Sequence, residues 1–287
     1  MKLHCLILWT GSEKTDFMAF QQLRTLQKDD IPSAMELSVE ANWNQTPEDW
    51  QMLIELEPRG CLAIEVENEI AATTTALFYG HRLAWIGMVL TRMQFRGQGL
   101  ARRLLTEALA LCDRMKIETV KLDATDMGKP LYEKFGFRVE QRAERWAGPG
   151  STKVTHSSAH LSEAAPITDL AAFGADRSAL LEKLARRNPP LHHKSSYAFT
   201  RTGRQKSYLG PCVCDDSTSA GSLLQRAVET INLSGWFWDL LPENQDAVRI
   251  AQELGFSPQR HLFRMVRGKD LRGKERAIYA IAGFELG

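Results

Sequence analysis

The segment Arg96-Gly97-Gln98-Gly99-Leu100-Ala101 has the residue types and spacing of an anion-binding turn. It lies between a predicted strand that ends near Thr91 and an amphipathic helix predicted from about Gly99 to Met115. Glycines let backbone N–H groups approach a ligand closely, and the first turn of a helix adds unpaired donors and partial positive charge. The segment therefore predicts a site for a phosphate or pyrophosphate group.

Two other interpretations of this turn stay open at the level of sequence. A dinucleotide-binding loop would require a third glycine, where the chain has Arg102, and the first strand of a βαβ unit, where the chain has a hairpin strand. A structural turn without a ligand would require the glycines alone. The three arginines at 96, 102 and 103 add positive charge near the turn.

A second motif, Tyr132-x-x-x-Gly136-Phe137, follows at the end of a short helix predicted over 128–135. It resembles motif B of the GNAT acetyltransferase superfamily, and Arg96-x-x-Gly99-x-Ala101 after a Val-Leu-Thr strand resembles motif A of the same superfamily. The predicted order of elements fits over residues 21–146: strand, helix, helix, hairpin, motif A, strand, motif B. Trp43-Asn44-Gln45 and the ending Ala280 to Gly287 are similar to a bacterial tandem branch of the superfamily.

The resemblance implies acetyl-CoA as cosubstrate and no metal. The backbone of the glycine turn would bind the pyrophosphate, and the strand before it would pair with the pantetheine arm. The residues expected to bind CoA are Val89, Leu90, Thr91, Arg96, Gly97, Gln98, Gly99, Leu100 and Ala101.

Two side chains are expected to move protons. The motif B tyrosine, here Tyr132, would protonate the departing thiolate; the alternative is a core tyrosine beside Leu131 and Phe135. Asp123, at the end of the strand before motif B, is a candidate base for the attacking amine, directly or through water. Its alternative is a capping or turn role with Thr125.

The loop Trp43-Asn44-Gln45 is expected to line the acceptor pocket, with Trp43 alternatively a core aromatic. Thr46 is a predicted N-cap, followed by Pro47 at the first helical position and Asp49.

The second half of the chain repeats the pattern of the first at an offset of 119 residues, which relates Gly136 to Gly255 and the long helix near 99–115 to one near 219–233. We expect an α/β tandem GNAT fold with a mixed, mostly antiparallel sheet flanked by helices. Its predicted parts are a catalytic domain over 21–147, a linker over 148–166 and a degenerate domain over 167–287. The second repeat has Asp215 where the first has Arg96, so only the first is expected to bind CoA.

The composition argues against several classes of protein. Thirty-six basic and 35 acidic residues give a formal charge of +1, which favours neither nucleic acid nor an anionic membrane as a partner. The apolar run at 3–9 is short for a signal sequence, no run is long enough to span a membrane, and five cysteines without a C-x-x-C pair show no zinc pattern. We expect reduced thiols and a cytoplasmic protein, and leave a homodimer open.

The sequence therefore predicts an N-acyltransferase that moves an acetyl group from CoA to a primary amine, by direct attack in a ternary complex. A small-molecule amine is favoured because the second repeat could cover the cleft. The alternative is an acyl-CoA-binding sensor without turnover.

Overall fold

The computed structural model describes residues 21–152, 162, 164–230 and 232–287. The apolar run at 3–9 and most of the predicted linker lie outside these residues. In the first half the elements are β1 (Gln21–Thr25), α1 (Ile31–Glu40), α2 (Pro47–Leu56), β2 (Cys61–Val66), β3 (Glu69–Tyr79), β4 (Leu83–Thr91), α3 (Leu100–Arg114), β5 (Thr119–Ala124), α4 (Lys129–Glu133) and β6 (Arg138–Gly148). The second half contains α5 (Ala165–Phe173), α6 (Ser178–Arg187), β7 (Leu191–His193), β8 (Ser196–Arg201), β9 (Ser207–Val213), α7 (Ser217–Val228), β10 (Trp236–Leu240), α8 (Gln245–Glu253), β11 (Ser257–Gly268) and β12 (Ile278–Ala280). Short 3-10 turns lie at Lys28–Asp30, Met93–Phe95 and Glu275–Ala277.

The described strands form one mixed sheet that runs through both halves, in the order β1-β2-β3-β4-β5-β11-β6-β10-β9-β8-β7, with β12 on β9. Only β4–β5 and β9–β10 are parallel among its described pairs. The predicted mixed, mostly antiparallel sheet with two repeats is confirmed.

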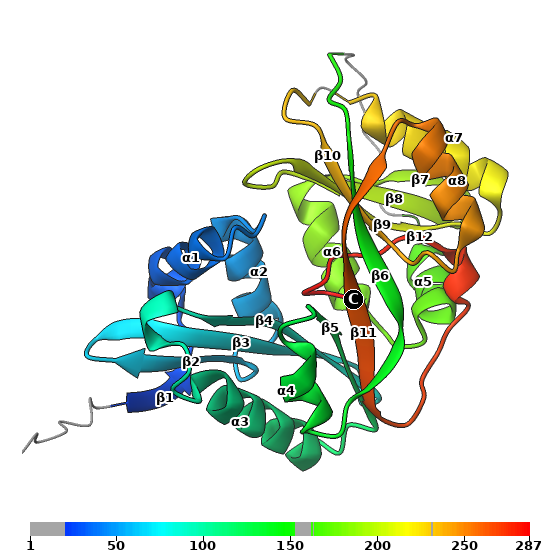
Figure 1. The fold of residues 1–287 in the computed structure, drawn as a ribbon. Coiled ribbons are helices and arrows are strands. Elements are labelled where there is room, and N and C mark those ends of the chain that lie inside the picture. The colour runs from blue at the N-terminus through cyan, green and yellow to red at the C-terminus, as the bar shows by residue number, and fades with distance from the viewer. Residues whose placement is uncertain (1–20, 153–161, 163, 231) are drawn as a thin grey trace, which may run out of the picture.

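The two halves exchange strands at the centre of this sheet. β11 belongs to the second half but lies between β5 and β6, and β6 belongs to the first half but lies between β11 and β10. Figure 1 shows the two long strands running side by side where the halves meet. The sheet is therefore continuous across the domain bounds predicted at 147 and 167, and these bounds stay predictions.

Helices cover both faces of the first half (Figure 1). α3 buries the stripe Leu100, Leu104, Leu105, Ala108, Leu109 and Cys112 against the sheet, which is the amphipathic helix that the sequence predicts. α1 and α2 cover the other face and share one hydrophobic core with α5 and α6 of the second half. That shared core fixes the α1–α2 loop against the second half.

Local signals in the sequence placed several of these elements correctly. The side chain of Thr46 accepts from the N–H of Asp49 and the Asp49 carboxylate accepts from the N–H of Thr46, so the predicted N-cap of α2 is a full capping box. The hairpin predicted before the glycine turn is β3–β4. The thiols of Cys61, Cys112, Cys212 and Cys214 are free and buried, as expected.

No helix in the described part of the chain is long and apolar enough to cross a membrane.

Candidate active site

A cavity of about 1000 Å3 opens along β4. It extends from the turn before α3, along β4, to residues of the second half. Its volume lies at the upper end of what small-molecule and cofactor sites need. The glycine turn, Asp123 and Tyr132, which lie on three successive elements of the chain, all line this one space.

The turn before α3 presents its backbone to the cavity. Gly97 and Gly99 have positive φ of 78° and 80°, which other residues adopt only with strain. An added Cβ at either position would meet no atom within 4 Å, so the space over the turn is open. The first residues of α3 add N–H groups without intrahelical partners. Open space over backbone N–H groups at a helix N-terminus is suited to an anion such as a phosphate or pyrophosphate.

β4 separates from β5 halfway along its length. The parallel pairing runs from Leu83–Thr119 to Ile86–Leu122 and stops there, although β4 continues to Thr91. At the same point β4 bulges against β3, and Met88 takes a positive φ of 49°. The result is a strand edge from about Gly87 to Thr91 that faces the cavity without a strand partner.

Threonine hydroxyls on β3 hold the bulge in place. Thr73 Oγ1 donates to the carbonyl of Met88 at 2.9 Å, and Thr74 Oγ1 donates to that of Gly87 at 3.3 Å. Both threonines are fully buried. These bonds satisfy two carbonyl groups that the irregular pairing leaves without their ordinary ladder partners.

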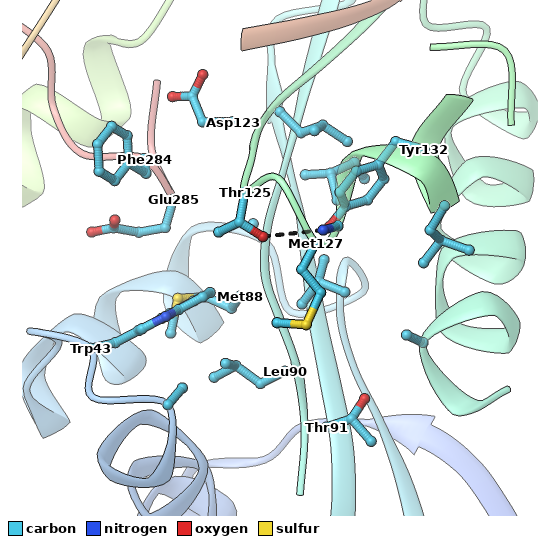
Figure 2. A pocket seen from close by; sticks show the side chains of 18 of the residues that line it. Trp43, Met88, Leu90, Thr91, Asp123, Thr125, Met127, Tyr132, Phe284 and Glu285 are labelled. Atoms are coloured by element: carbon cyan, nitrogen blue, oxygen red, sulfur yellow. Dashed lines mark hydrogen bonds between the residues drawn. The ribbon is translucent and has the colours of Figure 1, made fainter. Parts of the chain in front are cut away.

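Tyr132 on α4 faces the cavity with its ring against Phe137. In Figure 2 it lies across the view from Phe284 and Glu285, with Thr125 and Met88 between. Burial raises the pKa of the Tyr132 hydroxyl above its usual value, so the group stays protonated at neutral pH. Among the described residues no group hydrogen-bonds to this hydroxyl, which leaves it available to a ligand. The alternative of a core tyrosine also holds in part, because Tyr132 is only 8% exposed and packs in the hydrophobic core beneath α3.

Asp123 lines the cavity in an ion pair that the sequence did not predict. Arg264 of β11 donates to its two carboxylate oxygens at 3.0 and 2.9 Å, and the side chain of Asp123 is fully buried. Burial raises the pKa of Asp123, and the charge of Arg264 opposes that rise. Thr125 instead supports the following turn, because its Oγ1 accepts from the N–H of Gly128 at 3.2 Å.

The predicted CoA residues lie together around the cavity, with one exception. The residues that line it are Val89, Leu90, Thr91, Arg96, Gly97, Gly99, Leu100 and Ala101. Gln98 is exposed, is not among the lining residues, and donates from Nε2 to the carbonyl of Gln94 at 3.4 Å. Its contribution to a CoA site therefore stays a prediction, namely that its backbone N–H binds the pyrophosphate.

The predicted acceptor loop divides between two environments. Trp43 and Gln45 line the cavity, and Trp43 also packs against the shared core; its contact with an acceptor stays a prediction. Asn44 does not line it. Its Nδ2 donates to the carbonyl of Lys206 at 2.9 Å, and its Oδ1 accepts from the N–H groups of Gln205 at 2.8 Å and Lys206 at 3.2 Å. These bonds fasten the α1–α2 loop to the β8–β9 loop.

Replacement of Asn44 by alanine is therefore expected to act on stability. It leaves two backbone donors and one acceptor without this partner, which costs about 1–3 kcal/mol in the free energy of unfolding. Urea unfolding measures this loss, and Gln51→Ala on the exposed face of α2 is the control, expected to stay within about 0.5 kcal/mol. Unchanged stability together with a raised KM for an amine would instead support the predicted substrate contact.

The second half contributes residues to this cavity that the sequence did not single out. The segment after β12 brings Phe284 and Glu285 against β4, where a Cβ added at Gly87 would meet the Glu285 carbonyl oxygen at 2.9 Å. Trp85 Nε1 donates to the carbonyl of Phe284 at 2.9 Å, and Tyr79 Oη to that of Leu286 at 2.6 Å. The sequence did hold a signal for these residues: Glu285 is a charged residue between the apolar Phe284 and Leu286. A charge in an apolar run is rarely buried unless it has a partner, so its presence indicates a polar site.

In the second half, the place that corresponds to the open edge of β4 is filled by the chain itself. β9 pairs with β10 over Ser207–Leu209, and beyond that point β12 pairs with β9 at Cys212 and Val213. Trp238 Nε1 donates to the carbonyl of Tyr279 at 2.9 Å, and the N–H of Ile281 to that of Asp239, also at 2.9 Å. At the helix that follows, Asp216 caps α7, so a carboxylate occupies the place of the glycine turn.

Comparison with known proteins supports a tandem organisation. A model of the acetyltransferase (GNAT) family matches residues 20–137, and a model of an acetyltransferase (GNAT) domain matches residues 167–280. The uncharacterized N-acetyltransferase YitH of Bacillus subtilis is 28% identical over 57% of this chain and 60% of its own length. The holothin acyltransferase of a Pseudoalteromonas species is 24% identical over 88% of this chain and 90% of its own.

Solved structures share the whole arrangement. A protein of Pyrococcus horikoshii assigned as an acetyltransferase superposes with a TM-score of 0.82 over 97% of this chain and 99% of its own, at 23% identity. A GCN5-related N-acetyltransferase of Sphaerobacter thermophilus covers 92% of this chain and 98% of its own, with a TM-score of 0.62 and 16% identity. The chain therefore belongs to the GNAT acetyltransferase superfamily, with two GNAT domains in tandem.

Proposed function

We propose that the protein is an acetyl-CoA-dependent N-acyltransferase whose first GNAT domain transfers an acetyl group to the primary amine of a small molecule. One observation carries the proposal. The positive-φ glycine turn, the unpaired edge of β4 and the free hydroxyl of Tyr132 all face the same cavity. These are an anion site, a strand edge and an acid, which are the groups that an acyl-CoA thioester requires.

Each part has a role in this proposal. Backbone N–H groups from Arg96 to Ala101 bind the pyrophosphate, and Val89 to Thr91 pair with the pantetheine arm. A backbone N–H near the bulge of β4 binds the thioester oxygen as negative charge develops on it. The length of the open edge, from about Gly87 to Thr91, supports an extended arm lying beside β4.

The reaction requires two proton movements. The amine nitrogen bonds to the acetyl carbon, the C–S bond breaks, and Tyr132 gives its proton to the thiolate that leaves. Asp123, with its pKa raised by burial, accepts the proton that the ammonium must lose, directly or through water. Both side chains are then reset: the new amide nitrogen loses its remaining extra proton, which returns through water to the Tyr132 oxygen, and Asp123 releases its proton to solvent.

A small-molecule acceptor is favoured because Phe284 and Glu285 of the second half also line the cavity, on the side opposite Tyr132 and Thr91 in Figure 2. A relative at 24% identity is named for acyl transfer to holothin, which is consistent with this class of acceptor. In the second half, β12 and the Asp216 cap support a single CoA site for the chain.

Thiol release from acetyl-CoA across a library of primary amines tests the proposal. We expect saturable, amine-dependent release with some members of the library, and one molecule of CoA bound per chain by calorimetry. Tight CoA binding without release for any amine would favour the alternative, an acyl-CoA sensor. No CoA binding would overturn both.

A further inference from the structure

The far end of the cavity is built around charged groups from both halves. Three of its charges have partners: Arg145 donates to Asp239 at 2.7 and 2.6 Å, and Asp123 accepts from Arg264. Glu285 accepts from Arg201 at 3.3 Å. Within each pair the two charges neutralise each other. The charge of the acceptor that fits here is therefore determined by the lining residues that have no partner.

Arg260 of β11 is the charge left over. It lines the cavity, and no carboxylate of the described residues lies within ion-pair distance of its guanidinium. Its direct cross-strand neighbour on β6 is Arg145, and like charges in that position destabilise a sheet. Arg260 is exposed to solvent at this end of the cavity; partial desolvation and the charge of Arg145 lower its pKa below the usual value, and the charges of Asp239 and Glu285 oppose that shift. A bound anion would relieve this repulsion.

The ring of Phe284 holds this arginine near the cavity. The guanidinium of Arg145 lies 4.9 Å from the ring centroid of Phe284 and that of Arg260 lies 5.6 Å from it. Arg145 already uses two of its nitrogens on Asp239, whereas Arg260 has its whole fork of donors free for a planar anion such as a carboxylate.

An acceptor for N–H groups lies in the same part of the cavity. Gln45 is 7% exposed, and its Oε1 is buried without a hydrogen-bond partner among the described residues. It borders both the large cavity and a hollow of about 10 Å3 that it shares with Glu285. A buried acceptor without a donor costs about 1–3 kcal/mol, which an ammonium group would offset.

The Glu285 carboxylate also favours a cation at this place. It is 5% exposed, and burial raises its pKa because the charged form is poorly solvated there. Its contact with Arg201 is 3.3 Å long, against 2.6–3.0 Å for the other carboxylates of this region. A positive group in the cavity would stabilise the ionised carboxylate.

We propose that the acceptor is an amine that also carries a carboxylate or similar anion, with its amine at Gln45 and Glu285 and its anion at Arg260. This inference rests on the proposed function and narrows it. Polyamines and other acceptors rich in positive charge are excluded by it, because Arg260, which has no carboxylate partner among the described residues, would repel them.

The test uses matched sets of primary amines that differ only in the anion: α- and ω-amino acids, their amides, and the amines that lack the carboxyl group. Thiol release from acetyl-CoA gives kcat/KM for each. We expect the amino acid of at least one set to exceed its amide and its decarboxylated form by roughly tenfold or more, as one lost charge-assisted hydrogen bond predicts.

Variants of Arg260 assign that preference to the site. Arg260→Gln is expected to lower kcat/KM for the amino acid by roughly tenfold or more and that for the amide much less, so that the preference for the carboxylate is lost, and Arg260→Glu to reverse the preference in favour of diamines. Arg249→Gln, on the exposed face of α8, is the control and should keep the wild-type preference.

The outcomes separate the two proposals. Turnover of amides or polyamines at least as fast as amino acids would overturn the inference and leave the proposed function standing. A preference for amino acids that survives in Arg260→Glu would overturn the assignment to Arg260. Absence of release with every set, while CoA binds, would overturn the transferase itself.

Discussion

Replacement of Tyr132 by phenylalanine is expected to lower kcat for amine acetylation by roughly 100-fold or more, while the affinity for CoA changes little. The substitution removes one oxygen and keeps the ring that packs against Phe137. In the native protein that hydroxyl has no partner among the described residues and stays protonated, because burial raises its pKa. Without it the thiolate must leave unprotonated or take its proton from water.

Tyr279→Phe is the matched control for this experiment. Tyr279 is a buried tyrosine of the second half, 3% exposed, and does not line the cavity. Its loss of a hydroxyl should leave kcat at the wild-type level. Calorimetry with CoA and a single-turnover measurement of thiol release separate binding from chemistry. If Tyr132→Phe turned over at the wild-type rate, Tyr132 would be a core residue and the acid would have to be found elsewhere.

Gly99→Ala is expected to weaken CoA binding by roughly 30-fold or more. The residue is the N-cap of α3 with φ of 80°, and the added Cβ would project into the open space over the turn. Two losses combine there. The left-handed conformation costs about 1 kcal/mol with a Cβ, and a displaced phosphate loses charge-assisted bonds of about 1.5–3 kcal/mol each.

Gly80→Ala separates these two losses. Gly80 also has a positive φ, 63°, and an added Cβ there would likewise meet nothing within 4 Å, but it lies in the β3–β4 turn and outside the cavity. Both variants should lose similar stability in urea unfolding, and only Gly99→Ala should lose CoA affinity. Equal affinity in the two variants would contradict a pyrophosphate site at this turn.

Much of the site could be predicted from sequence because its signals are local. The glycine turn, the helix that follows it and Tyr132 lie within one stretch, and each depends on the conformation of its own segment. The stripe Leu100, Leu104 and Ala108 specifies the buried face of α3, and Thr46 with Asp49 specifies the start of α2. Local conformation and amphipathic period are what a single sequence records.

The strand exchange could not be predicted in this way. A strand's alternation of side chains specifies which face is buried and does not specify which strand lies beside it. β6 and β11 have the lengths and patterns that an unexchanged sheet would also accept. The ion pair of Asp123 with Arg264 depends on that exchange, because β11 brings Arg264 beside β5. The same holds for Arg145 and Arg260, which become neighbours only through it.

The segment that follows β12 serves both halves at once. β12 covers the edge of β9 in the second domain, and a few residues later Phe284 and Glu285 line the cavity of the first domain. An insertion or deletion between Ala280 and Phe284 would therefore disturb a folded core and an acceptor wall together. In related chains with this architecture, acceptor preference should therefore change by substitution of the side chains that line the cavity. The number of residues between β12 and these side chains should stay constant, even where the substrates differ.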